Sequence, residues 1–501
     1  MNIAARRFNK HVLQRGMVIG GLLAASALLG WAVLNPGSVR LLITVTLVIM
    51  FAAIQIKSPR AAILSLMVFL PFVGHIRRVL IPVAGWNTLD ALLVVSPIVV
   101  LLLSLNWLTR KYILREEIEG DTKLFKMVRI MLVIDLLQVF NPLQGSLFVG
   151  LSGIIYYIVP ILMMILGREY LNEKAIRTLF SLVFLIGILA ALYGYKQYWF
   201  GFFSFEEEWI QLSGYVALQV YTMVRPIGFF TNAAEYAHYL SIAITVGWGY
   251  FLRGSSGVRL FAAAGVVLMY TALFIESSRS AIVTCTTALF LMTVVCSKKA
   301  SSKVILTLVA VGVLIALFFG MQRLGNDNGL ITHSVSGLAD PMGEDSTLPG
   351  HIDYMFKGFK EGFSNPLGYG LGVTTIASGK FGGKALSSEI DWSNQFIATG
   401  LFGGAIYLLV FFRTLFLGIA KANGGNMLPL IIMGMLVSEA GQWLTGGHYA
   451  VVAILWLAIG YLDRSTADSP ITRQAINREG AYENADLTEF SSSRQPGFPL
   501  L

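Results

Sequence analysis

The chain has 501 residues, of which 55% are hydrophobic and only 13% are charged, and its formal net charge is +9. Soluble globular proteins have about 25% charged residues, so this chain has too few charges to build a water-facing surface. Its basic residues are scattered between apolar segments instead of being gathered on one domain, which argues against a nucleic-acid-binding protein.

The apolar residues form separated segments that are long enough to cross a hydrocarbon core about 30 Å thick. Backbone polar groups in lipid must be satisfied within the segment, so each segment is predicted to be a helix. The predicted spans, in chain order, are 17–34, 39–56, 61–74, 88–107, 128–141, 147–166, 178–199, 237–252, 258–275, 281–297, 304–320, 394–412, 428–442 and 446–462. The sequence therefore predicts an all-α, polytopic membrane protein with about 12–14 transmembrane helices.

The orientation follows from the distribution of basic residues between the spans. A basic stretch from Arg6 to Arg15 precedes the first span, which has no A-x-A-type cleavage site, so we expect a retained signal anchor. With this end in the cytoplasm, alternate loops are rich in Lys and Arg, as the positive-inside rule requires. The basic residues of these loops are Lys57, Arg60, Arg110, Lys111, Arg115, Lys123, Lys126, Arg129, Arg168, Lys174, Arg177, Arg253, Arg259, Lys298, Lys299, Lys303, Arg413 and Lys421. Both termini are then predicted to be cytoplasmic.

The connections divide the chain into three parts. N-terminal transmembrane helices occupy 1–177, and a second transmembrane domain occupies 178–462. This second domain contains two long extracytoplasmic loops, 200–236 and 321–390. The polar segment 463–501 has few apolar residues and is predicted to be a disordered cytoplasmic tail.

The first candidate for chemistry is the motif RPIGFFTN, which begins at Arg225 and precedes the span 237–252 at its outer end. A guanidinium group is always charged and binds phosphate oxygens in pairs, so Arg225 is suited to a diphosphate at the membrane surface. The alternative is an interfacial arginine that extends toward lipid head groups among belt aromatics.

The second candidate is Arg279, in the short outer turn ESSRSA. Arg279 lies on the side of the membrane that is otherwise poor in positive charge, and ionisable groups at such a depth are usually functional. Glu276 is three residues away and could form an ion pair with Arg279. A structural ion pair and an anion-binding arginine both remain open.

The third candidate is the large outer loop and its end, where His351, Glu389 and Asp391 could act as an acid or a base. No strand or nucleotide-binding unit surrounds the closely spaced glycines of 368–372, so they do not form a phosphate loop. The possible metal ligands show no recognisable spacing, and we predict neither a metal site nor a cofactor. Those side chains are His333, Asp340, Glu344, Asp345 and His351. Asp135, inside the span 128–141, is a separate candidate because carboxylates within a membrane are usually functional.

Taken in order, these motifs resemble those of the bacterial O-antigen ligase and polymerase superfamily. The resemblance rests on R-P-x-G-x-F at 225–230, S-R-S-A at 278–281, N-P-L-G-x-G-x-G at 365–372 and G-L-x-G at 400–403. It covers roughly 180–415. It implies a glycosyltransferase of the bacterial inner membrane that needs no metal and no nucleotide sugar. The donor would be an undecaprenyl-diphosphate-linked glycan, and further partners would be membrane lipid, a chain-length regulator and a flippase.

In such an enzyme, Arg225 and Arg279 would stabilise the diphosphate leaving group. Ligases of the family typically have a catalytic histidine near the end of the large loop, where this chain has Glu389 and Asp391. This departure favours a polymerase of lipid-linked repeat units over a ligase that transfers glycan to lipid A or protein. The base remains open between Glu389, Asp391 and His351. A secondary transporter is the alternative from another class, favoured by Asp135, although no internal repeat is visible.

Overall fold

The computed structural model describes most of the chain between residues 36 and 464. The described residues are 36–87, 90–115, 122–214, 218–297, 312, 329–343, 346–386, 390–423, 425–442 and 448–464. The predicted spans 17–34 and 304–320 (Gly312 apart) and the predicted tail beyond residue 464 lie outside this part of the chain.

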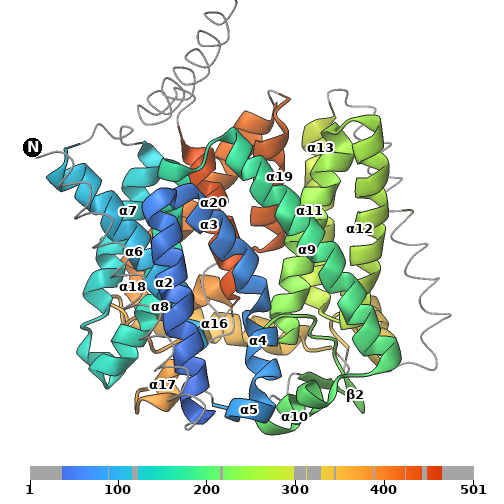
Figure 1. Cartoon of the computed structure of the whole chain (residues 1–501), viewed down its shortest axis with the longest axis horizontal. Coiled ribbons are helices and arrows are strands. Elements are labelled where there is room, and N and C mark those ends of the chain that lie inside the picture. The colour runs from blue at the N-terminus through green and yellow to red at the C-terminus, as the bar shows by residue number, and fades with distance from the viewer. Residues whose placement is uncertain are drawn as a thin grey trace, which may run out of the picture.

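The described chain is a bundle of helices, joined by short 3-10 and π turns (Figure 1). The helices are α2 (Val39–Lys57), α3 (Pro59–Phe69), α4 (Val73–Val79), α5 (Ile81–Ala84), α6 (Val95–Leu108), α7 (Lys123–Gln138), α8 (Leu147–Tyr170), α9 (Glu173–Phe200), α10 (Ser204–Ser213), α11 (Ala233–Arg253), α12 (Ser256–Glu276), α13 (Arg279–Cys296), α15 (Gly329–Ala339), α16 (Leu348–Ser364), α17 (Ala377–Lys380), α18 (Asp391–Asn423), α19 (Met427–Ser438) and α20 (Tyr449–Asp463). In the described part of the chain, the strands are β1 (Gln219–Val220) and β2 (Met223–Val224), which form an antiparallel hairpin.

Eight segments of the described chain are long and apolar enough to cross a membrane. They are Val39–Lys57, Pro59–Val79, Ala91–Ile113, Leu147–Tyr170, Glu173–Phe200, Ser256–Glu276, Arg279–Cys296 and Asp391–Asn423. The prediction of an all-α, polytopic membrane protein is confirmed. Apart from 17–34 and 304–320, every predicted span overlaps a helix, although α19 ends at Ser438 and is shorter than the predicted span 428–442.

The innermost helices are those that are apolar all round. In α20 nearly every residue is buried, and the same holds for α19 and for most of α11. An all-apolar helix can face either lipid or protein in a membrane protein, and these helices are enclosed by the others. By contrast, only 17% of the apolar window of α2 is buried, so α2 lies at the periphery.

Small residues bring α8 and α20 into close contact. A Cβ added to Gly167 would lie 2.2 Å from the Leu457 carbonyl oxygen, and one added to Gly460 would lie 2.1 Å from that of Met164. Glycine at both positions therefore lets the two backbones touch, which is how many membrane helices associate.

One end of the bundle carries the longer connections. We call it the loop face: it includes α5, α10, the β1–β2 hairpin and α17 at the lower edge of Figure 1, and α16 just above them. The segment 225–232 is held there by α4, because the Arg78 guanidinium donates to the carbonyl oxygens of Gly228 (2.9 Å) and Phe230 (2.5 Å). Gly74 of α4 lies directly against the backbone of Phe230.

The glycine motif 365–372 packs against a break in α18. Gly400 has a φ of +70°, and a Cβ there would lie 2.1 Å from the Pro366 carbonyl oxygen. The backbone amides of Tyr369 and Gly370 donate to carbonyl oxygens of α18 just before the break, and the amide of Leu401 donates to Pro366. These bonds satisfy non-helical backbone inside the protein, so the glycines have a structural role.

Candidate functional site

The two arginines that the motifs single out lie in one cluster on the loop face. Arg225 follows β2, and its Nη2 lies 2.7 Å from Oε1 of Glu276, the last residue of α12. Its Nε also donates to the Glu276 backbone carbonyl oxygen at 3.0 Å. The Glu276 side chain is fully buried, whereas that of Arg225 is 15% exposed. Glu276 thus pairs with Arg225, and the expected alternative of a pair with Arg279 is not what the structure adopts.

A tight turn joins α12 to α13 and orients the side chains around it. Ser277 has a φ of +74°, a left-handed conformation that costs a residue with a Cβ about 1 kcal/mol or more. The Glu276 carboxylate accepts the Ser278 backbone N–H at 2.9 Å, which holds the turn in place. The Ser277 hydroxyl lies 2.7 Å from Nδ1 of His333 on α15. The turn therefore links Arg225, Arg279 and His333.

Arg279 begins α13 and extends across α15. Its Nη2 lies 3.3 Å from Nε2 of His333 and donates to the Thr347 hydroxyl at 3.1 Å, just before α16. A Cβ on Gly337 would lie 1.5 Å from Nη1 of Arg279, so only glycine at 337 leaves room for the guanidinium group. Both of these side-chain contacts are with neutral groups.

His333 is half-buried and lies between two positive charges. Burial lowers the pKa of His333 to about 4, and the nearby Arg279 and Arg225 guanidinium groups lower it in the same direction. The imidazole is therefore neutral at pH 7. Because Arg279 can only donate, Nε2 of His333 must be the acceptor, and Nδ1 carries the proton and donates to Ser277. The ring thus directs its lone pair toward the arginine.

The three predicted acid–base residues lie in different places. His351 is exposed in the first turn of α16, and its backbone N–H donates to the carbonyl oxygen of Thr347, the residue that Arg279 contacts. Asp391 is only 1% exposed at the start of α18, within electrostatic range of the Tyr157 hydroxyl of α8. Glu389 lies outside the described residues. The structure thus brings His351 close to the arginine cluster and places Asp391 inside the bundle.

The other polar candidates lie within the helices. Asp135 on α7 is fully buried, and neither of its carboxylate oxygens has a hydrogen bond in the described part of the chain. Nδ1 of His238 on α11 lies 2.8 Å from Oε2 of Glu439, and the imidazole ring of His448 is 4.9 Å from that of His238. These groups are separate from the arginine cluster.

Within the described residues, no three His, Cys, Asp or Glu side chains gather as metal ligands do. His333 and Asp340, two of the residues weighed as metal ligands, lie on or next to α15, and His351 lies on α16. Glu344 and Asp345 lie outside the described part.

Sequence reasoning weighed His333 only as a metal ligand and missed its place beside Arg279. Arg77 and Arg78 were also missed, although the signal that identifies Arg279 applies to them. In the predicted orientation they are positive charges on the side of the membrane that is poor in positive charge.

No protein-family model matches the chain, and no curated protein matches it.

Proposed function

We propose that the chain is a membrane glycosyltransferase that polymerises lipid-linked repeat units. The observation that carries the proposal is the convergence of Arg225 and Arg279 on the neutral imidazole of His333 at one end of the bundle. The motif resemblance to the O-antigen ligase and polymerase superfamily supports the same reaction class.

The two arginines would bind the diphosphate of the donor, an undecaprenyl-diphosphate-linked glycan. Arg225 pairs with the buried Glu276, and Arg279 lies beside the neutral His333, so both guanidinium groups are held at the same end of the bundle. Guanidinium groups bind phosphate oxygens in pairs, and they stabilise the negative charge that develops on a departing diphosphate.

His333 would act as the general base. When Arg279 turns to the diphosphate, Nε2 of His333 is released and can accept the proton of the acceptor hydroxyl. The hydroxyl oxygen then forms the new bond to the anomeric carbon, the bond from that carbon to the diphosphate oxygen breaks, and undecaprenyl diphosphate leaves with its electron pair. Direct displacement of this kind inverts the configuration of the anomeric carbon.

The positive-inside rule supports an orientation with the loop face outside the cytoplasm. The junctions α2–α3, α8–α9 and α11–α12 lie at the end opposite the loop face (Figure 1). They carry the basic residues Lys57, Lys174, Arg177, Arg253 and Arg259. A loop face on the outer side of the bacterial inner membrane is where lipid-linked glycans would be assembled.

Polymerisation is favoured over ligation because the loop end that carries the ligase histidine in the resemblance has Asp391 in this chain. The deciding experiment compares the lengths of carrier-linked glycans in cells with and without the protein. Single repeat units alone on the carrier after its loss would support a polymerase. Long carrier-linked chains that fail to reach their acceptor would instead identify a ligase, and an unchanged pattern would contradict both.

A further inference from the structure

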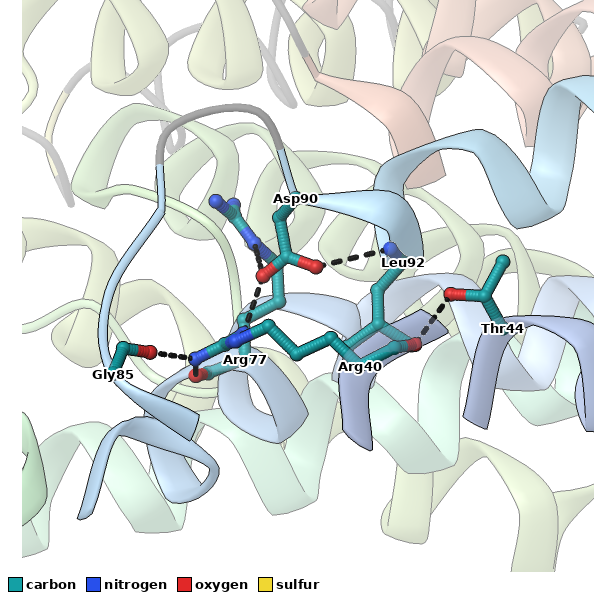
Figure 2. A network of polar contacts seen from close by, with 6 residues as sticks. All are labelled: Arg40, Thr44, Arg77, Gly85, Asp90 and Leu92. Carbon is teal, nitrogen blue, oxygen red and sulfur yellow. Dashed lines mark hydrogen bonds and ion pairs between the residues drawn. The ribbon is translucent and has the colours of Figure 1, made fainter. Parts of the chain in front are cut away.

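A second arginine cluster lies on the loop face, formed by α2, α4 and the turn before α6 (Figure 2). Asp90 accepts hydrogen bonds from Arg40 and, at 3.0 Å, from Nε of Arg77. Arg40 also donates to the carbonyl oxygens of Arg77 and Gly85, at 3.0 and 2.5 Å. The side chain of Asp90 is fully buried, and those of Arg40 and Arg77 are 5% and 9% exposed.

Two arginines share a single carboxylate in this cluster, which leaves one positive charge uncompensated among the three groups. An unbalanced charge away from water is costly, typically by several kcal/mol, unless a counter-charge is supplied. A charge of this kind in a membrane protein is by default a candidate for binding an anionic ligand.

Arg40 and Arg77 differ in how they use their nitrogen atoms. The terminal nitrogens of Arg40 donate hydrogen bonds to Asp90 and to backbone carbonyl oxygens. Arg77 contacts Asp90 only through Nε, and Figure 2 shows both of its terminal nitrogens directed away from the carboxylate. Within the described residues these two nitrogens make no hydrogen bond, while the ring of Trp86 covers the guanidinium group at 4.7 Å. Arg77 is thus held rigidly with its paired donors still available.

Arg77 faces polar side chains from other elements. The hydroxyl groups of Tyr156 on α8 and Tyr449 on α20 lie within electrostatic range of Arg77 and are 3.3 Å from each other. The side chain of Lys380, at the end of α17, is largely exposed. The part of it that is buried lowers its pKa, and the positive charge of Arg77 lowers the pKa further. Lys380 and the two tyrosine hydroxyl groups are thus all within electrostatic range of Arg77.

We propose that Arg77 and Lys380 bind the phosphate groups of a second lipid diphosphate, that of the acceptor repeat unit. This inference rests on the proposed function, because a polymerase must hold two lipid-linked diphosphates at once. Arg225 and Arg279 act on the donor diphosphate, whose bond to the sugar breaks. Arg77 and Lys380 position an acceptor whose diphosphate stays intact while its sugar hydroxyl attacks.

Arg78, the next residue on α4, connects the proposed acceptor site to the proposed donor site. It donates to the backbone of Gly228 and Phe230, in the segment that begins with Arg225, whereas Arg77 on the same helix faces the second site. Helix α4 thus fixes the donor segment and presents the acceptor arginine, so the two diphosphates would bind at a set separation.

The test is the number of undecaprenyl diphosphate molecules that the purified full chain binds in phosphatidylcholine nanodiscs. We expect two per chain for the wild type and one for Arg77→Gln. The exposed Lys380→Gln should keep the fold and bind the second molecule about tenfold more weakly, as for a lost hydrogen bond to a charged group. Lys384→Gln, another exposed lysine of the same loop, is the matched control and should bind two.

The variants separate the inference from the proposed function. If Arg279→Ala loses one molecule while Arg77→Gln and Lys380→Gln still bind as the wild type does, the acceptor site is wrong and the donor site stands. If Arg77→Gln loses one and Arg279→Ala loses none, the anion site stands and the donor assignment fails. Competition by phosphatidylglycerol distinguishes the phosphate source. If this lipid abolishes the binding that depends on Arg77, the site recognises an ordinary head group and the acceptor assignment is overturned.

Discussion

Two arginine clusters at opposite ends of the bundle use the same residue type for different purposes. Away from the loop face, Arg168 of α8 forms an ion pair with Asp463 of α20, donates to Thr122 at 3.2 Å and lies 4.5 Å from the ring of Phe125. The side chains of Arg168 and Asp463 are 4% and 2% exposed. This cluster joins three helices and balances one positive charge with one negative charge.

The loop-face cluster has a different composition, because a histidine lies beside its second arginine. Arg225 pairs with Glu276, but the side chains that Arg279 is seen to contact, His333 and Thr347, are neutral. The comparison shows that arginines at the two ends of this bundle have partners of different kinds. Arg168 pairs with a buried carboxylate and joins helices, whereas Arg279 lies beside a half-buried histidine at the loop face.

The largest effect should come from removing a loop-face guanidinium group. We expect Arg279→Ala and Arg225→Ala each to lower polymer formation at least about 100-fold, because each removes charge stabilisation of the leaving diphosphate. Polymer length and yield, measured at matched amounts of inserted protein, check this. Arg259→Ala, an exposed arginine of the opposite end, is the control. Full polymer from both loop-face variants would remove the diphosphate assignment.

Replacing His333 should have the next largest effect. We expect His333→Gln to lower turnover about 100-fold, as for a lost general base, without loss of bound undecaprenyl diphosphate. His351→Gln, nearby and exposed, should have a much smaller effect. The same assay applied to Asp391→Asn and Glu389→Gln tests the remaining predicted bases. A larger loss of turnover from one of these variants than from His333→Gln would show that His333 is not the general base.

The pH dependence of kcat/KM tests the same histidine independently. Because the pKa of His333 in the free protein is lowered to about 4, the base is already neutral at pH 6, and kcat/KM should be flat from pH 6 to 8. The value of kcat/KM should then fall as the pH drops through about 4, when the imidazole gains a proton. The fall should be absent from the residual activity of His333→Gln. A wild-type midpoint near 6.5 would show that neither burial nor the arginines lower the pKa of the catalytic base, and it would contradict the assignment of His333.

Arg168→Gln should affect stability and leave catalysis unchanged. Removing one partner of a buried pair leaves Asp463 without its ion-pair partner and should cost about 3 kcal/mol or more. The expected readout is a lower thermal midpoint in detergent and less protein per cell, with polymer per folded molecule unchanged. An unchanged thermal midpoint together with lost polymer would show that Arg168 acts in polymer formation and does not stabilise the fold.

The smallest effect is expected for Asp135→Asn. The carboxylate is fully buried without a hydrogen bond, so a neutral amide of the same shape should change the thermal midpoint little and the polymer length not at all. Loss of polymer, or of ion-coupled uptake into proteoliposomes, would instead favour the transporter alternative.

The sequence alone predicted the helices because apolar length is a local property. A span such as 147–166 is apolar enough to require lipid or protein around it, and α8 forms there whatever its neighbours are. The boundaries were less predictable where packing decides them. The predicted span 394–412 became the longer α18, which breaks at Gly400 because the segment 365–372 packs into that position.

The sequence by itself determined that this is a multi-pass, all-α membrane protein, and it marked Arg225 and Arg279 as charges in unusual places. Only the tertiary structure decided which residues share a site with them. His333 is 54 positions beyond Arg279 and reaches it because Gly337 leaves room for the guanidinium group on α15. The physical reason is that hydrophobicity acts locally along the chain. Charge balance, however, depends on the contacts between elements that are distant in sequence, as Arg77 and Asp90 also show.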